Sequence, residues 1–463
     1  MDMNQTIAAL STPPGESGLA MLRLSGPDTR AVVSRVFQPA DRRVAALALE
    51  HRRVYHGTII DADGETIDEV MCVVMQAPES YTGEDTAELS CHGNMLIVSK
   101  ILNIIMAAGA RAAEPGEFTK RAFLCGKLDL IQAEAVCDLI QARSELQRGV
   151  AQKQLQGELS RRIRRLAEET VGLLGSVEAN IDFIEEDIDV YDRTASIQLL
   201  ERQKKVLAEL LSGAGFSRPF RDGFSVVIAG PVNAGKSTLF NKLVGEPRAI
   251  VTDIPGTTRD VIREPVVFEG LVFILQDTAG IRKRTTNIIE TIGLGRARQA
   301  ASAADMVIFL LDGTQLIEPE IEESIRQLDP ARSLIVINKI DQPAVLSAET
   351  VHKSLLNFRL TTISGLNGEG IERLKTLMVD TVGREQLSYI ARQRVLVNSR
   401  LVSLLESADR ITGGLIDSLQ SDRPLEILAV EIRDLLGVYE EAIGKRYTDN
   451  LLDNIFSRFC IGK

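Results

Sequence analysis

The sequence predicts a multidomain protein of α+β and α/β structure: an α+β N-terminal domain, then an all-helical domain interrupted by an α/β domain. A chain of 463 residues is too long for a single hydrophobic core. Residues 222–380 alternate apolar runs with helical segments, whereas the flanking stretches are rich in Leu, Glu, Gln and Arg at helical spacing. We expect domains over 1–117, 118–221, 222–380 and 381–463, the second and fourth being two arms of one helical domain.

The first 117 residues predict short strands and helices in alternation. AMLRLSG (20–26) has the composition of a strand. HGTIIDADGETIDEVMCVVM (56–75) predicts a hairpin that turns at Asp63-Gly64, and LIVSKILNIIMAAGA (96–110) has the apolar periodicity of a helix. This mixture is typical of an α+β domain.

Composition and charge limit the classes of partner. Hydrophobic residues make up 44% of the chain, and no apolar run reaches membrane-spanning length, so we expect a soluble protein without a membrane partner. The five cysteines form no C-x-x-C pair and no secretory signal is visible, which favours the cytoplasm. A net charge of −11 opposes bulk attraction to nucleic acid; the basic patches RRIRR (161–165) and RKR (282–284) are more simply interpreted as solvated surface.

GPVNAGKS (230–237) is a complete phosphate loop of the pattern G-x-x-x-x-G-K-S. FSVVIA (224–229) predicts a buried strand before it, and TLFNKLVG (238–245) predicts a helix after it. Backbone N–H groups and the positive end of that helix bind the α- and β-phosphates, while Lys236 would reach the β- and γ-phosphates and Ser237 would bind Mg²⁺. The loop residues assigned to the nucleotide are Asn233, Ala234, Gly235, Lys236, Ser237 and Thr238.

Two further motifs, DTAG (277–280) and NKID (338–341), each end an apolar run. Asp277 would hold Mg²⁺ through water. Asp341 can accept two hydrogen bonds from the edge of guanine, whereas adenine would place an acceptor against the carboxylate, so the nucleotide is GTP rather than ATP. The residues assigned in these motifs and in the closing loop SGL (364–366) are Asp277, Thr278, Ala279, Gly280, Asn338, Lys339, Asp341, Ser364, Gly365 and Leu366.

Seven segments spread over nearly the whole chain form a further pattern. They are STPPGESG (11–18), LRLSG (22–26), YTGEDTAEL (81–89), PGEFTKRAF (115–123), KLDLIQAEAVCDLI (127–140), GTTRD (256–260) and FCIGK (459–463). With these segments the chain resembles the MnmE (TrmE) family of tRNA-modification GTPases. The resemblance implies a folate-binding α+β N-terminal domain and an all-helical domain interrupted by a Ras-like α/β P-loop GTPase domain.

The resemblance also implies cofactors and partners. Family members form a homodimer through the N-terminal domain and bind a 5-formyl-tetrahydrofolate-type cofactor there. With the flavoprotein MnmG (GidA), which holds FAD, they add an aminomethyl or carboxymethylaminomethyl group to C5 of the wobble uridine, position 34, of certain tRNAs. By motif, the folate contacts fall on Arg23, Glu84, Lys127 and Lys463, and Cys460 is a candidate for the modification chemistry. A small buried hydrophobe is the alternative interpretation of Cys460.

The resemblance also indicates which groups assist GTP hydrolysis. Ile281 follows Gly280, so the glutamine with which many GTPases orient water is absent. The chain is instead similar to the potassium-activated GTPases of the TrmE-Era-EngA-like group, in which a monovalent cation replaces an arginine finger. The residues assigned to K⁺ on this basis are Asn233, Thr252, Ile254 and Thr257, and those assigned to Mg²⁺ are Ser237 and Thr258.

Glu290 is the only carboxylate between Gly280 and Ile292, and the family places its water-orienting acid in this segment. Glu290 is therefore assigned as the catalytic residue. The simpler alternative is a glutamate that the dipole at a helix N-terminus favours.

Two other functions stay open. A ribosome-assembly GTPase of the Era or Der type would share the GTP motifs, but it needs an RNA-binding module after the GTPase domain, and the C-terminal arm is poor in aromatic residues for stacking. A GTP-dependent conformational switch would position partners without chemistry on this chain. In that case Cys460 and the folate residues would tolerate substitution.

Overall fold

The computed structural model describes residues 3–61, 63–182, 192–245, 263–277, 304–383, 390, 396–421 and 423–463. The chain divides into two compact units. The first comprises Met1–Cys137, Gln154–Asp192 and Asp422–Lys463, and the second comprises Asp138–Lys153 and Arg193–Ser421. The stretches predicted as one helical domain therefore contribute to both units. The boundaries at 117, 221 and 380 stay predictions.

The N-terminal part of the first unit contains a seven-stranded sheet in the order β3-β4-β5-β6-β2-β1-β7. Neighbouring strands are antiparallel, except that β1 and β7 run parallel. The predicted hairpin is confirmed as the β4–β5 pair. The strands are β1 (Ile7–Leu10), β2 (Ser17–Ser25), β3 (Phe37–Pro39), β4 (Val54–Ile60), β5 (Thr66–Met75), β6 (Thr86–Gly93) and β7 (Arg111–Ala112).

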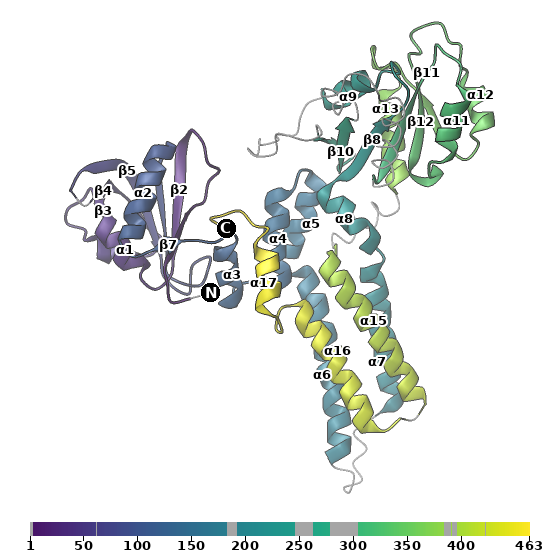
Figure 1. Ribbon diagram of the computed structural model, residues 1–463. Helices are drawn as coiled ribbons and strands as arrows, with labels where there is room; N and C mark the ends of the chain where they lie inside the picture. Colours follow the sequence, from purple (N-terminus) through teal and green to yellow (C-terminus); the bar gives the residue numbers. More distant parts are fainter. Residues whose placement is uncertain are drawn as a thin grey trace. The chain divides into compact units, whose positions relative to one another are not determined.

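Two helices, α1 (Thr29–Val36) and α2 (Met95–Ala107), pack on one face of this sheet (Figure 1). The strands alternate buried and exposed residues, as expected for a sheet with one covered face. Asn94 caps α2, since its side chain accepts a hydrogen bond from the backbone N–H of Leu96 at 2.8 Å. The buried core between helices and sheet includes Leu22, Val33, Ile59, Leu89 and Ile101.

The first unit also contains helices from both predicted arms. They are α3 (Glu117–Leu124), α4 (Leu130–Gln141), α6 (Glu158–Asp182), α16 (Leu425–Ala442) and α17 (Asp449–Phe456). α16 packs along α6, and α17 packs on α3. The two arms thus meet within this unit, as the helical periodicity on both sides of the α/β domain predicts. A short 3₁₀ helix, Ala46–Ala48, precedes β4.

The second unit begins with the last residues of α4, from Asp138, and continues with α5 (Glu145–Leu155), whose C-terminal end belongs to the first unit. It then contains α7 (Arg193–Leu211) and α8 (Ala214–Asp222). α7 packs along α15 (Ser399–Gln420), which comes from the second arm. Gln147 of α5 donates hydrogen bonds to the carbonyls of Phe220 and Arg221, at 2.6 and 3.2 Å, and so fixes the end of α8. α8 leads directly into the second sheet.

The second sheet has six strands in the order β13-β12-β11-β8-β10-β9. All neighbours are parallel except the β9–β10 pair. The strands are β8 (Phe224–Ala229), β9 (Arg263–Phe268), β10 (Leu271–Asp277), β11 (Met306–Asp312), β12 (Ser333–Asn338) and β13 (Arg359–Thr362). β8, β11 and β12 lie inside the sheet and are almost wholly apolar, which is typical of strands covered on both faces.

Helices cover both faces of this parallel sheet (Figure 1). α9 (Lys236–Val244) and α13 (Ile371–Val382) pack on one face, and α11 (Pro319–Arg326) and α12 (Ala348–Ser354) pack on the other. A 3₁₀ helix, Pro330–Arg332, leads into β12. The mixed first sheet and this doubly covered parallel sheet confirm the predicted α+β and α/β fold class. Within the described residues, every helix is too short or too polar to cross a lipid bilayer.

Candidate nucleotide and N-terminal sites

The phosphate loop joins β8 to α9 at the carboxyl edge of the parallel sheet. Two of its glycines have backbone conformations and surroundings that exclude a side chain. A Cβ on Gly230, at φ 136°, would lie 2.2 Å from the carbonyl oxygen of Leu310, and a Cβ on Gly235, at φ 95°, would lie 2.3 Å from Nδ2 of Asn338. Asn233 is also left-handed, at φ 63°, a conformation that asparagine tolerates better than most residues.

Lys236 begins α9 and folds back over the loop. Its Nζ donates hydrogen bonds to the carbonyl oxygens of Gly230 and Pro231, at 2.9 and 2.5 Å. Ser237 and Thr238 follow in the first turn of α9 with exposed side chains. The backbone N–H groups of the loop and its lysine are hydrogen-bond donors suited to a polyphosphate, and an exposed hydroxyl at the helix N-terminus is an oxygen ligand suited to Mg²⁺.

Asn338, the last residue of β12, connects the phosphate loop to the closing loop. Its buried side chain donates from Nδ2 to the carbonyl oxygen of Ala234 at 2.8 Å and accepts at Oδ1 from the backbone N–H of Gly365 at 2.8 Å. Asn338 therefore braces the phosphate loop against the closing loop.

Asp341 lies beside the same closing loop. The Ser364 hydroxyl donates a hydrogen bond to Asp341 Oδ1 at 2.5 Å and accepts one from the backbone N–H of Asn367 at 3.1 Å. Ser364 is fully buried, whereas Leu366 is 73% exposed. The structure thus brings NKID and SGL together at one edge of the sheet, with Asp341 held by a fixed hydroxyl.

Asp312 is a contact of this site that the sequence analysis missed. It ends β11, and its Oδ2 accepts a hydrogen bond from Lys339 Nζ at 2.6 Å. Burial raises the pKa of Asp312, but the hydrogen bonds from Lys339 and Thr314 outweigh burial and hold the pKa below its usual value. The sequence does hold a signal for Asp312, because this aspartate ends the apolar run MVIFLLD, and the DTAG and NKID motifs also follow apolar runs.

Several sequence-based assignments fall outside the described residues. They are Thr252, Ile254, Thr257, Thr258, Thr278, Ala279, Gly280, Glu290 and the RKR patch at 282–284. Asp277 is the last residue of β10, where it pairs in register with Ile228 of β8. β8 ends one residue later at the start of the phosphate loop, so the backbone of Asp277 lies beside that loop.

The four residues assigned to folate lie around the loop that leads into β6. Arg23 of β2 donates to Glu88 Oε1 from Nε and Nη2, at 2.9 and 2.7 Å, and its guanidinium lies 5.7 Å from the ring centre of Tyr81. Lys127 donates to the carbonyl oxygen of Pro78 at 3.1 Å. Glu84 belongs to the loop itself, so two of the assigned residues contact residues 78–88 and a third lies among them.

The C-terminal tail contains Lys463, the fourth residue assigned to folate. The carbonyl oxygen of Gly462 accepts hydrogen bonds from Ser11 Oγ at 3.1 Å and from Arg23 Nη1 at 3.3 Å, which places the tail against β2. Burial, together with the nearby charge of Arg23, lowers the pKa of Lys463. The Cys460 side chain is exposed, so the alternative interpretation of this residue as a small buried hydrophobe is wrong.

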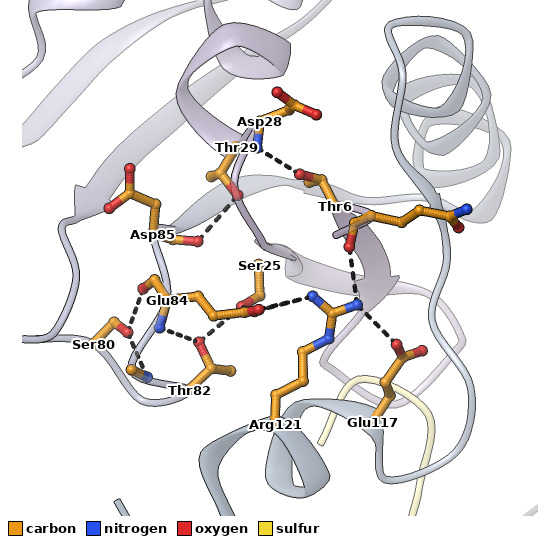
Figure 2. Close-up of polar contacts among 12 residues, drawn as sticks. Thr6, Ser25, Asp28, Thr29, Ser80, Thr82, Glu84, Asp85, Glu117 and Arg121 are labelled. Carbon is orange, nitrogen blue, oxygen red and sulfur yellow. Dashed lines mark hydrogen bonds and ion pairs between the residues drawn. The ribbon is translucent and has the colours of Figure 1, made fainter. Parts of the chain in front are cut away.

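A buried ion-pair cluster lies beside the loop that contains Glu84 and leads into β6 (Figure 2). The Arg121 side chain of α3 is fully buried between Glu84 and Glu117, with nearest N–O distances of 3.0 Å to each. Glu117 also accepts hydrogen bonds from Arg111, at 2.5 and 2.8 Å, and from the backbone N–H of Glu114 at 2.9 Å. No feature of PGEFTKRAF distinguishes Arg121 from its neighbours as a functional residue.

The arginines of the 161–165 patch in α6 have local partners. Arg162 pairs with Glu158, Arg165 pairs with Glu169, and Arg164 pairs with Asp129. Arg161 donates to the carbonyl oxygen of Gln156 at 2.8 Å. These contacts fit the interpretation of the patch as a solvated helix face.

A phosphate loop on a doubly covered, mostly parallel sheet, braced by the buried asparagine of NKID, defines a P-loop GTPase. Family models for the MnmE helical domain and for the N-terminus of the GTP-binding protein TrmE match residues 130–460 and 6–127. The tRNA modification GTPase MnmE of Geobacter sulfurreducens is 40% identical, and that of Thermotoga sp. strain RQ2 is 39% identical; the alignments cover 100% and 99% of this chain and 100% of each relative. The chain therefore belongs to the MnmE family of GTPases.

The stability of the buried cluster should depend on pH. Burial raises the pKa of Glu117, but its hydrogen bonds to Arg111, Glu114 and Arg121 outweigh burial and lower the pKa below 4.5. The carboxylate thus stabilises the fold above about pH 4.5, and this contribution is lost as the pH falls through the lowered pKa. We expect Glu117→Gln to cost about 3 kcal/mol at pH 7 and progressively less below pH 4.5, measured by urea unfolding.

Glu50→Gln is the matched control, because the Glu50–Arg53 pair lies in the same domain with both side chains more than 60% exposed. That variant should unfold like the wild type at every pH. A Glu117→Gln deficit that stays constant between pH 7 and pH 3 would contradict the assignment of a charged, stabilising Glu117.

Proposed function

We propose that this GTPase couples GTP hydrolysis to modification of C5 of the wobble uridine, position 34, of certain tRNAs. The product would be an aminomethyl or carboxymethylaminomethyl uridine, made with an MnmG-type flavoprotein that supplies FAD. The main support is the identity of 39–40% with curated relatives over the full length of the chain. This similarity includes both the nucleotide-binding segments and the N-terminal segments, as expected if one chain links hydrolysis to tRNA chemistry.

The N-terminal site suits a 5-formyl-tetrahydrofolate-type ligand. Such a ligand has a pterin edge of hydrogen-bond donors and a carboxylate tail, and the site offers the Glu84 carboxylate together with the cations Arg23, Lys127 and Lys463. Glu84 would accept from the pterin, and the cations would bind the tail. Cys460 is exposed on the tail that contacts Arg23, which supports a role near the folate. Dimerisation through this domain and a cytoplasmic location are further parts of the proposal.

In the nucleotide site, Ser237 and Thr258 would bind Mg²⁺ directly, and Asp277 would bind it through water. Lys236 would leave the carbonyls of Gly230 and Pro231 for the β- and γ-phosphates, since a polyphosphate is the stronger acceptor. Glu290 would orient the attacking water. K⁺, held by Asn233, Thr252, Ile254 and Thr257, would offset charge in the transition state.

Nucleoside analysis of tRNA tests the main proposal. In cells that lack the protein, the modified wobble uridine should disappear, and expression of the wild-type chain or of Lys242→Ala should restore it. Lys236→Ala should fail to restore it, because Lys236 rather than Lys242 would bind the phosphates; both lysines belong to α9. Unchanged wobble modification in the deletion strain, with altered ribosomal subunits instead, would favour an Era- or Der-type function.

The rate of hydrolysis should depend on the monovalent cation. We expect GTP turnover to be about tenfold or more faster in KCl than in NaCl at equal ionic strength, within the range that an arginine finger covers. Asn233→Ala should remove most of this difference, whereas Asn241→Ala, an exposed position in α9, should retain it. Equal wild-type rates in the two salts would exclude a catalytic K⁺.

A further inference from the structure

The Arg121 guanidinium is divided between one inner and one outer carboxylate. Nη1 donates to both oxygens of Glu84, at 3.1 and 3.0 Å, while Nη2 donates to Glu117 Oε1 at 3.0 Å and to the carbonyl oxygen of Gln5 at 2.9 Å (Figure 2). Both nitrogens are therefore committed, and the planar group cannot rotate without breaking several contacts. Arg121 fixes the carboxylate of Glu84 relative to α3 and to Gln5, two residues before β1.

A ring of hydrogen bonds fixes Glu84 from the other side. Ser25 Oγ donates to Glu84 Oε2 at 2.7 Å, and the hydroxyls of Ser25 and Thr82 are 2.7 Å apart. Because the single Ser25 proton goes to Glu84, the Thr82 hydroxyl donates to Ser25. The backbone N–H of Glu84 donates to Thr82 Oγ1 at 3.2 Å and closes the ring, in which each bond polarises the next.

Neighbouring contacts fix the backbone of the same loop. Ser80 Oγ donates to the carbonyl oxygen of Glu84 at 2.5 Å and accepts from the backbone N–H of Gly83 at 2.9 Å. Ser25 and Thr82 are fully buried. The side chain and the backbone of Glu84 are thus both held before any ligand binds.

The two acids of the cluster differ in exposure. The Glu117 side chain is completely buried and already gives Arg121 a counter-ion, whereas the Glu84 side chain is 13% exposed. Glu117 is also paired with Arg111, whose side chain is 29% exposed, so Glu84 is the second carboxylate that balances the two arginines. The partly exposed carboxylate has the property expected of the group that meets a ligand, since an ionised carboxylate has about four acceptor positions and the described contacts leave room for more.

We infer that Arg121 and Ser25 are positioning residues for the proposed folate site, which hold Glu84 so that its remaining acceptor positions face the pterin donors. This inference rests on the proposed binding of folate. A carboxylate that is already ordered loses less conformational freedom when the ligand binds, so the effect should appear in affinity. Neither residue needs to touch the ligand.

A double-mutant cycle on the full-length protein tests the inference, with 5-formyl-tetrahydrofolate binding measured by calorimetry. Lys cannot reach Glu84, Glu117 and the Gln5 carbonyl together, so Arg121→Lys should weaken binding about tenfold or more, and Ser25→Ala should weaken it about threefold. In a Glu84→Gln background each change should alter the affinity less than about twofold, because the carboxylate that they orient is gone.

Lys120→Met is the matched control. Lys120 is the neighbouring buried cation of α3 and pairs with Asp453 at 2.7 Å, and none of its described contacts is to Glu84. This variant should bind folate within about twofold of wild type, and all variants should bind GTP normally. A comparable loss in Lys120→Met would indicate a general structural effect and overturn the inference.

Two other results would also overturn the inference. In the first, the folded Arg121→Lys protein binds folate as tightly as the wild type does. In the second, Arg121→Lys lowers the affinity as much in the Glu84→Gln background as in the wild type. If Arg121→Lys does not fold, Ser25→Ala decides, and wild-type affinity in that variant refutes the role. If the wild-type protein binds no folate, the proposed folate site itself is excluded. If the wild type binds folate and the variants bind it equally well, only the positioning role is excluded.

Discussion

The nucleotide domain depends on one buried amide, the side chain of Asn338. It lies where the loops after β8, β12 and β13 meet, and it satisfies one acceptor of the phosphate loop and one donor of the closing loop. Because a buried polar group that loses its partner costs about 1–3 kcal/mol, neither loop can move away cheaply. The same amide explains why Gly235 has no side chain, since a Cβ there would collide with Nδ2. The phosphate loop and the closing loop are therefore held by one rigid connection.

The first unit uses buried charge for a similar purpose. Arg121 joins the loop at Glu84 to α3. The C-terminal tail after α17 then contacts β2 through the Gly462 carbonyl. Residues from the beginning and the end of the chain thus surround one loop, which explains how Arg23 and Lys463 come together although 439 positions separate Arg23 from Gly462, the neighbour of Lys463.

Local patterns predicted the local structure well. The β4–β5 hairpin follows from alternating apolar residues around Asp63-Gly64, and the strand, loop and helix at the phosphate loop follow from GPVNAGKS and its apolar flanks. Contacts between distant segments were not predictable in this way. Nothing near Arg121 in the sequence indicates that it binds the Gln5 carbonyl, and Asp312 could be recognised only by its place at the end of an apolar strand. The exposure of Cys460 likewise depends on how the tail folds back, which composition does not encode.

We propose that this site recognises guanine through Asp341, whose carboxylate accepts a hydrogen bond from the Ser364 hydroxyl at 2.5 Å. The most direct measurement compares GTP and xanthosine triphosphate affinities of the wild type and Asp341→Asn. An amide at this position presents a donor where guanine also presents donors, so GTP affinity should fall about 100-fold or more, while xanthosine triphosphate affinity should rise. Asn367→Asp, in the neighbouring closing loop, should keep the wild-type preference. Unchanged GTP affinity in Asp341→Asn would contradict the claim.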